Sequence, residues 1–241
     1  MFEIIQSEMF NRRGFTKHGF TAGDGFGRDR GEEEAVDARF VELKNRLQTD
    51  APLAQLQQVH GATVVNGADP AVRSVAWTDR PTVEGDALVS FDRDVVLAVR
   101  TADCAPVLIA CPTTGAVAAV HAGWKGLAKG VVRDAVKSLV RGDASPIGLL
   151  AAIGPCICEK CYEVGEDVAR HFPESVDPVK DHPGKFMMEL ALAVEVSLIT
   201  AGLTSDNIDR LDICTACGNR GLHSHRASGG NCSRQLAFIC G

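Results

Sequence analysis

Continuous apolar runs, without alternating polar residues, characterise the middle of the chain. PVLIAC at 106–111 and AVAAVH at 116–121 flank a turn at 112–115, and GLLAAIG follows at 148–154. Runs of about five aliphatic residues between turn residues are typical of strands that are buried on both faces. The same criterion predicts further strands at 53–66, with an interruption at Gly61, and at 86–91, 94–100, 210–217 and 234–240.

Helical spacing of apolar residues is clearest between residues 32 and 47. Acidic residues open this segment and basic residues close it, which matches the helix dipole. The predicted buried face consists of Ala35, Val36, Phe40, Leu43 and Leu47. Apolar residues also recur at every fourth position from Leu127 to Leu139, which predicts a helix over 123–139. Two more helices are predicted at 163–172 and 187–202.

Few segments of the chain look irregular. Residues 14–31 hold six glycines among polar residues, a composition typical of loops, so residues 1–31 are expected to lack regular structure. The stretch 173–185 contains proline and glycine and is predicted to be a surface connection. No low-complexity linker or internal repeat divides the sequence. We therefore predict one domain of mixed α and β structure over residues 1–241.

Composition and charge exclude several classes of protein. The chain is 45% hydrophobic and 23% charged, as in ordinary folded proteins. Its formal net charge of −6 argues against nucleic-acid binding, which needs clustered Lys and Arg. No apolar run reaches the roughly 18 residues that span a membrane, and the N-terminus does not resemble a signal peptide. We expect a cytoplasmic protein without nucleic-acid or membrane partners.

Nine cysteines are the unusual feature of this composition. An odd number cannot pair fully within one chain, and proteins of the reducing cytoplasm rarely depend on disulfides. The cysteines are therefore expected to be core residues, metal ligands or a nucleophile.

Three predicted strand ends carry metal-capable side chains. They are His60 in QVHG, Cys104 in ADCAP and His121 in VHAGW. Functional side chains gather at such junctions because a rigid sheet directs them into one cleft. Two imidazoles and a thiolate form a three-ligand zinc set with an open fourth position, and the same set suits copper. Residues buried in the core are the alternative, and the wide sequence separation of the three does not distinguish the two interpretations.

A second group of cysteines lies towards the end of the chain. The patterns are CICEKC at 156–161 and CTAC at 214–217, with Cys232 and Cys240 beyond them. Four thiolates from Cys156, Cys158, Cys161, Cys214 and Cys217 could form a structural zinc site. Small core thiols after a tight turn are the alternative interpretation. Cys111 follows a predicted strand and is expected to be buried and inert.

The polar, glycine-rich stretch 220–234 contains three arginines and two histidines. The planar guanidinium of arginine suits phosphate or carboxylate, so this stretch is a candidate anion contact. A solvated surface loop is the alternative. The sequence contains no P-loop, no dinucleotide-binding glycine motif after a strand and no G-x-S-x-G elbow.

Six motifs together resemble those of the YfiH/YlmD family over about residues 18–239. They are QVHGATVV (58–65), DALVS (86–90), TADCAPVLIA (101–110), AAVHAGWKGLAKGVV (118–132), AAIGPCICEKCYEVGEDV (151–168) and CTACGNRGLHSHRASGG (214–230). That family has been labelled multicopper polyphenol oxidase, or laccase domain. It is now regarded as a family of zinc-dependent purine nucleoside phosphorylases with adenosine deaminase side activity.

The resemblance implies a fold, a cofactor and substrates. The fold is an α/β or α+β layered sandwich of mixed β-sheets with flanking helices, like that of the putative cysteine hydrolases. The implied ligands of zinc are His60, Cys104 and His121, and the implied substrates are a purine nucleoside and phosphate. The expected assembly is a monomer or a homodimer.

The implied chemistry assigns provisional roles to further residues. In phosphorolysis, Arg226 or Lys125 would neutralise the phosphate, and Asp103 would carry a proton. In deamination, a water molecule activated by the metal would attack C6 of adenine. The sequence departs from the family where HGFTAGDGFG (18–27) lacks an arginine, and where Ala227 replaces the second arginine of FSYRR. Arg226 and Arg234 remain to contact the anion.

Three other hypotheses use the same residues. A copper-dependent polyphenol oxidase would suit the two histidines and one cysteine, but seven histidines are too few for several copper centres. A cysteine hydrolase, linked in this family to editing of peptidoglycan precursors, would use Cys104 as nucleophile and His60 or His121 as base. In a non-enzymatic protein, the zinc would be purely structural.

Overall fold

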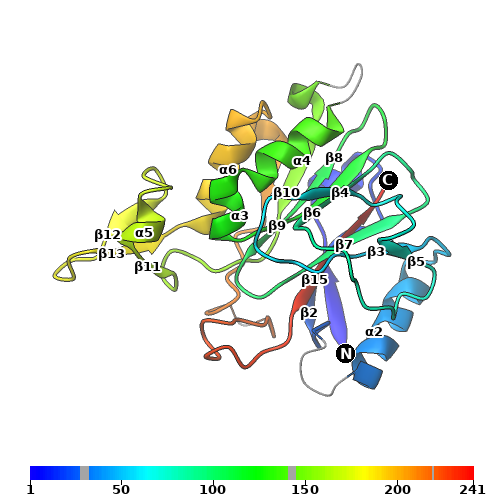
Figure 1. The fold of residues 1–241 in the computed structure, drawn as a ribbon, viewed down its shortest axis with the longest axis horizontal. Coiled ribbons are helices and arrows are strands. Elements are labelled where there is room, and N and C mark those ends of the chain that lie inside the picture. The colour runs from blue at the N-terminus through cyan, green and yellow to red at the C-terminus, as the bar shows by residue number, and fades with distance from the viewer. Residues whose placement is uncertain (28–32, 141–144, 219) are drawn as a thin grey trace.

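The computed structural model describes residues 1–27, 33–140, 145–218 and 220–241. Two six-stranded sheets form its centre (Figure 1). The first contains, in spatial order, β1 (Phe2–Ile5), β2 (His18–Gly23), β15 (Gln235–Cys240), β7 (Val96–Thr101), β3 (Leu53–Ala54) and β5 (Arg73–Ser74). The second contains β14 (Ile208–Arg210), β10 (Leu150–Ile153), β8 (Ala105–Ala110), β9 (Val117–Ala122), β6 (Ala87–Ser90) and β4 (Val64–Asn66). Both sheets mix parallel and antiparallel pairs.

The inner strands β8, β9, β10 and β15 are buried on two faces, as their continuous apolar runs predict. In β8, Val107 and Ile109 pack in the core on the helical side, whereas Leu108 and Ala110 pack between the sheets. In β7, Leu97 and Val99 meet that same central core from the other sheet. Successive side chains of a strand point to opposite faces, so one apolar run serves two layers of core.

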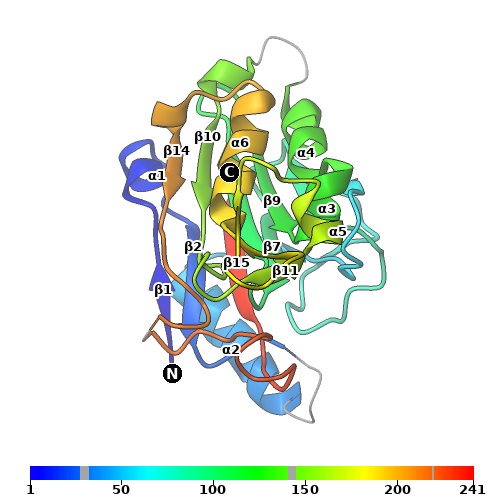
Figure 2. The same cartoon turned by 90° about the vertical axis from the view of Figure 1, so that its left-hand side faces the viewer.

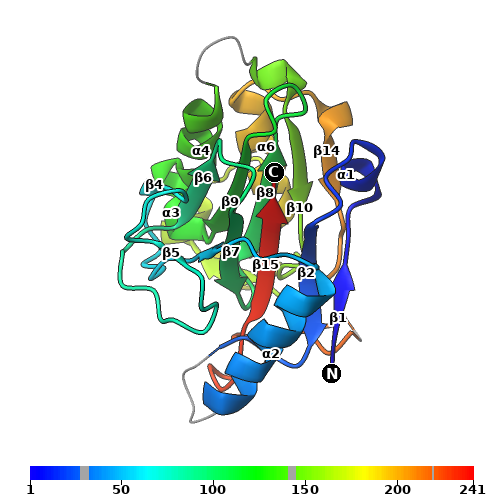
Figure 3. The same ribbon diagram turned by 90° about the vertical axis from the view of Figure 1, so that its right-hand side faces the viewer.

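The helices are α1 (Glu8–Arg12), α2 (Glu33–Arg46), α3 (Trp124–Lys129), α4 (Val131–Leu139), α5 (Glu166–Ala169) and α6 (Leu190–Thr200), with 3₁₀ turns at Pro146–Gly148 and Ser205–Asn207. Four of them, α2, α3, α4 and α6, cover the outer faces of the sandwich, whereas α1 buries Phe10 between the sheets and α5 packs on a small third sheet. Figure 3 shows α2 over the outer face of the first sheet, and Figure 2 shows α3, α4 and α6 over the second. The result is a layered sandwich of mixed α and β structure. The finer likeness to putative cysteine hydrolases stays a prediction.

The predicted helix at 32–47 is present as α2, and its first residue, Glu32, lies outside the described residues. Val36, Phe40 and Leu43 of α2 are fully buried against the first sheet, as the spacing predicts, whereas Ala35, also predicted on that face, is exposed. The predicted helix at 123–139 is instead divided into α3 and α4. The cause is Gly130, whose φ of 91° is left-handed and ends α3 before α4 begins.

Predictions for three other regions were wrong. The N-terminal segment forms β1, α1 and β2 rather than irregular structure. The glycine-containing strand β2 is held by backbone pairing with β1 on one side and β15 on the other. The segment 53–66 is two strands in different sheets, joined by a loop that carries His60. Residues 211–217 lie beyond β14 and form no strand, apart from a single bridge between Cys156 and Cys214.

A small third sheet replaces two predicted helix starts and part of a predicted loop. It consists of β11 (Glu163–Gly165), β13 (Lys185–Met188) and β12 (Val176–Pro178) and projects from one side of the sandwich (Figure 1). The helices α5 and α6 consequently begin only after β11 and β13. Pairing between strands far apart in sequence overrides local helical spacing here.

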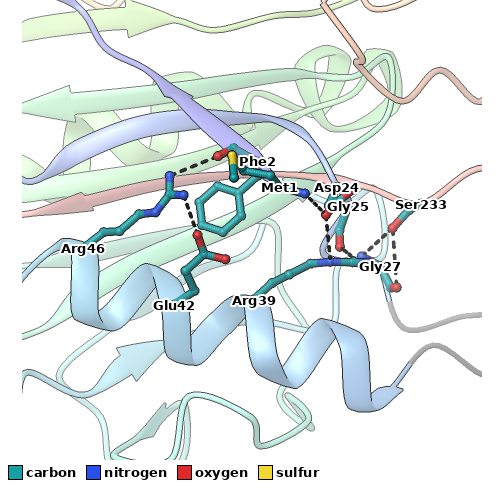
Figure 4. Close-up of polar contacts among 9 residues, drawn as sticks. All are labelled: Met1, Phe2, Asp24, Gly25, Gly27, Arg39, Glu42, Arg46 and Ser233. Atoms are coloured by element: carbon teal, nitrogen blue, oxygen red, sulfur yellow. Dashed lines mark hydrogen bonds and ion pairs between the residues drawn. The ribbon is translucent and has the colours of Figure 1, made fainter.

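Polar contacts of α2 hold the loop after β2 against the end of the chain (Figure 4). Arg39 donates to the carbonyl oxygen of Gly25 at 2.5 Å, and Asp24 binds the N-terminal ammonium. The N–H of Gly27 donates to Oγ of Ser233 at 2.9 Å. Gly27 and the neighbour of Ser233, Arg234, both border a cavity of about 730 Å³, so these contacts position one of its walls.

Among the helices of the described residues, none is long and apolar enough to cross a membrane.

Candidate metal centre and its cavity

The three predicted strand junctions converge on one point. Cys104 immediately precedes β8, and His121 lies near the end of β9, where the antiparallel register pairs it with Pro106. His60 reaches the same point from the loop between β3 and β4. The ligand atoms of the three side chains all lie within 4.8 Å of one another. The fold thus brings together residues whose sequence spacing carries no metal-binding signal.

A buried carboxylate, Asp86, holds both histidines in place. Its Oδ1 lies 2.8 Å from Nδ1 of His121 and accepts the backbone N–H of His60 at 2.9 Å. Its Oδ2 accepts the N–H of Gly61 at 2.6 Å. With Nδ1 engaged by the carboxylate, Nε2 of His121 is left for Cys104 and the centre of the cluster. Asp86 therefore fixes the orientation of one ring and the backbone of the other.

Strained or close backbone positions surround the cluster. His60 and Asp103 have left-handed φ angles of 57° and 87°, which residues other than glycine seldom adopt. Gly123 has no side chain because a Cβ there would lie 2.9 Å from Sγ of Cys104 and 3.2 Å from the His60 ring. The close approach of thiol and imidazole depends on this glycine.

The cluster is electrostatically coupled. Burial raises the pKa of Cys104, but hydrogen bonds with His121 and His60 outweigh it and lower the pKa to about 6. Burial lowers the pKa of His121, but Asp86 and Cys104 outweigh it and raise the pKa to about 9. Burial likewise raises the pKa of Asp86, and hydrogen bonds from His121 and Gly61 bring it below its ordinary value. Cys104 is therefore poised as a thiolate at neutral pH.

The cluster opens into a cavity of about 730 Å³. This volume falls in the range that holds a small organic ligand. His60, Cys104 and His121 form part of its wall. The cationic side chains that line it are Arg80, Arg100, Arg226 and Arg234. In a chain of net negative charge, four arginines around one cavity favour an anionic ligand.

Asp103 also lines the cavity, and both of its carboxylate oxygens accept hydrogen bonds. Oδ1 accepts the hydroxyl of Thr215 at 2.6 Å, and Oδ2 accepts the backbone N–H of Arg226 at 2.7 Å. The guanidinium of Arg226 lies over the Tyr162 ring, 5.2 Å from its centroid, and donates to the carbonyl oxygen of Glu163 at 3.0 Å. Asp103 thus joins the C-terminal loop to the junction that bears Cys104.

Lys125, the other predicted anion contact, lies elsewhere. Its side chain is exposed, with Nζ 5.6 Å from the centroid of the Trp124 ring. It is absent from the described residues that line the cavity. Lys125 is the second residue of α3 and lies outside the cavity lining, so its placement gives no support to a role in phosphate binding.

Asp86, Arg100 and Tyr162 belong to the site but were not predicted from the sequence. Asp86 directly precedes a buried strand, and a carboxylate at the start of an apolar run was the one signal that could have identified it. Arg100 interrupts the apolar run of β7 and is half-buried, with a position on the cavity. Tyr162 follows the last cysteine of CICEKC, and nothing in that pattern points to the cavity.

The second group of cysteines also converges, with one exception. The Sγ atoms of Cys158, Cys161, Cys214 and Cys217 lie within 4.8 Å of one another. Cys156 is instead buried in the core beside the second sheet. Cys111 is buried as predicted, and Cys240 is buried with its thiol 3.2 Å from the carbonyl oxygen of Arg93.

Comparison with known proteins identifies close relatives. The family model described as multi-copper polyphenol oxidoreductase laccase matches residues 9–241. A purine nucleoside phosphorylase of Deinococcus radiodurans is 37% identical over 218 residues, covering 86% of this chain and 80% of that protein. An adenosine deaminase named RL5, from an unknown prokaryote, is 34% identical and covers 85% and 80% of the two chains. The crystal structure of YlmD from Geobacillus stearothermophilus superposes with a TM-score of 0.82 at 28% identity, covering 94% and 92%.

Proposed function

The chain belongs to the multi-copper polyphenol oxidoreductase laccase family, the family of YlmD and YfiH, and from this premise we propose that it is a metal-dependent enzyme acting on purine nucleosides. The reaction is phosphorolysis of inosine, adenosine or guanosine to the free base and ribose 1-phosphate, with deamination of adenosine as a side activity. One observation carries the proposal: a metal-capable cluster opens into a cavity lined by four arginines. Relatives named purine nucleoside phosphorylase and adenosine deaminase support it.

The residues of the cluster fit a zinc ion. His60, Cys104 and His121 would hold it through two imidazole nitrogens and one thiolate, a set that leaves one position for substrate. Asp86 supplies the carboxylate that commonly orients a zinc-bound histidine. When bound, zinc acts as a Lewis acid beside the substrate.

The cavity supplies the contacts that phosphorolysis requires. A phosphate oxygen attacks the anomeric carbon, the glycosidic bond breaks, and the departing base takes a proton. The guanidinium groups of Arg226 and Arg234 neutralise the phosphate and orient it towards that carbon. Arg100 adds a third guanidinium at the end of β7. Arg226 stands at the first arginine of the family motif FSYRR, and Arg100 and Arg234 compensate for the family arginines that this sequence lacks.

The contacts of Asp103 support a positioning role. Its carboxylate holds the backbone of Arg226 and the hydroxyl of Thr215, so it fixes the loop that brings Arg226 to the cavity. Its earlier assignment as a proton carrier stays a prediction. Burial and, to a smaller extent, the charge of the nearby Cys104 raise the pKa of Tyr162 to about 12. The Tyr162 hydroxyl therefore stays neutral and can donate a hydrogen bond.

The proposal is tested with purified protein, zinc, phosphate and each nucleoside in turn. Ribose 1-phosphate and free base are expected in equal amounts, and omission of phosphate should stop their formation. Adenosine without phosphate should yield inosine, the product of deamination. If zinc-loaded protein forms none of these products, the proposed function is wrong.

A cysteine hydrolase is the second candidate, because Cys104, His121 and Asp86 are arranged like a nucleophile, its base and the group that orients the base. Such an enzyme would act on peptidoglycan precursors without a metal. Hydrolysis that survives zinc removal and stops on alkylation of Cys104 would favour it. Loss of activity with zinc removal, restored by added zinc, supports the first candidate instead.

The family description favours copper as an alternative metal, and a phenol oxidase as the corresponding activity. The donor set of His60, Cys104 and His121 suits copper as well as zinc. Among the described residues, however, the other metal-capable group contains only cysteines, which leaves no histidine cluster for further copper centres. An intense visible thiolate-to-copper band, together with phenol oxidation, would support the oxidase.

We also propose that residues 1–241 act as one domain in the cytoplasm, as a monomer or homodimer. Limited proteolysis that yields a stable fragment would contradict the single domain. Light scattering would measure the assembly, and an oligomer larger than a dimer would contradict that part of the proposal.

A further inference from the structure

We propose that Cys158, Cys161, Cys214 and Cys217 bind a second zinc ion, a structural one separate from the nucleoside site. The four thiols come from two turns of the pattern C-x-x-C, about 50 residues apart in sequence. All four Sγ atoms lie within 4.8 Å of one another, and those of Cys158 and Cys217 are 3.8 Å apart. None of the four forms a disulfide.

The spacing of the sulfur atoms suits one ion. A tetrahedron of thiolates at the usual zinc–sulfur distance of about 2.3 Å has edges of about 3.8 Å, the separation found between Cys158 and Cys217. An iron–sulfur cluster places several iron and sulfide ions between its cysteines. Sulfur atoms gathered within 4.8 Å leave room for a single metal ion.

The backbone around the four cysteines is arranged for thiolate ligands. The N–H groups of Cys158, Ala216 and Cys217 all point to Sγ of Cys214, at 3.3 to 3.4 Å. Such donors stabilise a sulfur that carries negative charge. A backbone hydrogen bond closes each turn. The N–H of Cys161 donates to the carbonyl oxygen of Cys158 at 3.0 Å, and the N–H of Gly218 donates to that of Cys214 at 3.1 Å.

Gly218, at the end of the turn that begins at Cys214, has no space for a side chain. A Cβ on Gly218 would lie 2.3 Å from the carbonyl oxygen of Cys214, so only glycine closes this turn. Cys214 and Cys217 of this turn lie with their Sγ atoms beside those of Cys158 and Cys161. The four-ligand set is complete without substrate or water, as structural zinc sites are.

The second site braces the wall of the nucleoside cavity. The N–H of Cys156 donates to the carbonyl oxygen of Ile213, and the N–H of Thr215 donates to that of Cys156, both at 3.1 Å. The N–H of Ile157 donates to the carbonyl oxygen of Asp103 at 3.0 Å. Thr215 also donates its hydroxyl to Asp103, the neighbour of Cys104. An ion at the four thiolates would therefore fix the segments that hold this junction in place.

The test uses the full chain with His121→Ala, which removes a ligand of the first site, purified with reductant and zinc. We expect this variant to retain one zinc ion per chain, with four sulfur neighbours at about 2.3 Å in X-ray absorption. Adding Cys217→Ser should weaken zinc binding by more than about 100-fold, because loss of a ligand exceeds the effect of losing an outer partner. Adding Cys111→Ser, a cysteine outside both groups, should leave zinc binding unchanged.

The proposal is overturned if His121→Ala protein binds no zinc, if its zinc has nitrogen or oxygen neighbours, or if the four thiols form a disulfide. Should the double variant fail to fold, X-ray absorption on the single variant decides the question. Neither measurement involves a nucleoside, so failure of the proposed enzymatic function would not affect it.

Discussion

Among the described residues, the two metal-capable groups differ in donors, access and support. The first combines two imidazoles with one thiolate, is oriented by the buried carboxylate of Asp86 and opens into a cavity of about 730 Å³. The second consists of four thiols on two tight turns and is supported by backbone N–H groups. Three ligands beside a cavity leave one coordination position open for substrate, as in catalytic zinc sites. Four protein ligands fill the coordination of the ion, as in structural zinc sites.

The electrostatics of the two groups follow the same division. In the first, imidazoles lower the pKa of Cys104 to about 6 although burial raises it. In the second, burial and the hydrogen bond with Cys214 raise the pKa of Cys158 to about 11. Cys214 differs from Cys158 because three backbone N–H groups lower its pKa to about 7 against the effect of burial. Thiols crowded together without imidazoles require a cation before all of them ionise.

Changing Cys104 should separate catalysis from stability most strongly. Cys104→Ser should reduce kcat/KM for inosine by more than about 100-fold, because the metal loses its anionic ligand. Its Tm should stay within a few degrees of wild type, measured by calorimetry beside Cys111→Ser. A large fall in Tm with activity retained would mean that the first group is structural, and the comparison would be reversed.

The corresponding change in the second group should affect stability first. Cys214→Ser should lower Tm by roughly 10 °C. An ion whose Kd lies about 1,000-fold below its free concentration stabilises the folded chain by about 4 kcal/mol, and the variant loses this contribution. Activity well below Tm should fall less than in Cys104→Ser, because the second ion only braces the junction at Asp103. An unchanged Tm, with Cys111→Ser as the matched control, would show that the four cysteines hold no structural metal.

Asp86 provides a smaller test of how the first group is supported. Asp86→Asn preserves the shape but removes the charge that orients His121, and should weaken zinc binding and activity by about 10–100-fold. Asp94→Asn, which changes an exposed carboxylate in the turn before β7 and away from the cavity, should change neither. Equal zinc affinity in Asp86→Asn and wild type would mean that the carboxylate does not position the ligand.

How much of this arrangement was predictable depended on the range of the interactions. The hairpin of β8 and β9 followed from its apolar runs, and α2 followed from its spacing. The pairing of β11 with β13 was not predictable, because the two strands lie about 20 residues apart and the local pattern of each favours a helix. Long-range backbone pairing decided those segments.

The same reasoning applies to the sites. His60, Cys104 and His121 were selected from residue type at strand ends, and from the resemblance to a family, since no local spacing links them. Asp86 was missed because a single carboxylate before a strand has no periodic signature. The second group was visible as two C-x-x-C patterns, but only the fold shows that Cys156 turns into the core while the other four converge.

The smallest expected effect concerns the anion contacts of the cavity. Arg226→Gln should raise KM for phosphate by roughly fivefold, about 1 kcal/mol, because the side chain is exposed and other arginines remain. Deamination, which uses no phosphate, should be unchanged. Lys125→Gln should alter neither reaction, and a larger effect of Lys125→Gln than of Arg226→Gln would relocate the phosphate site.

Graded removal of metal from the wild-type chain tests the division between the two groups most directly. Bound zinc, phosphorolysis of inosine and Tm would be followed together as chelator is added. The open site should release its ion first, so activity should disappear as zinc falls from two to one per chain while Tm holds; Tm should then fall with the second ion. Activity that persists in metal-free protein, or activity and Tm that fall together with a single ion, would contradict this account.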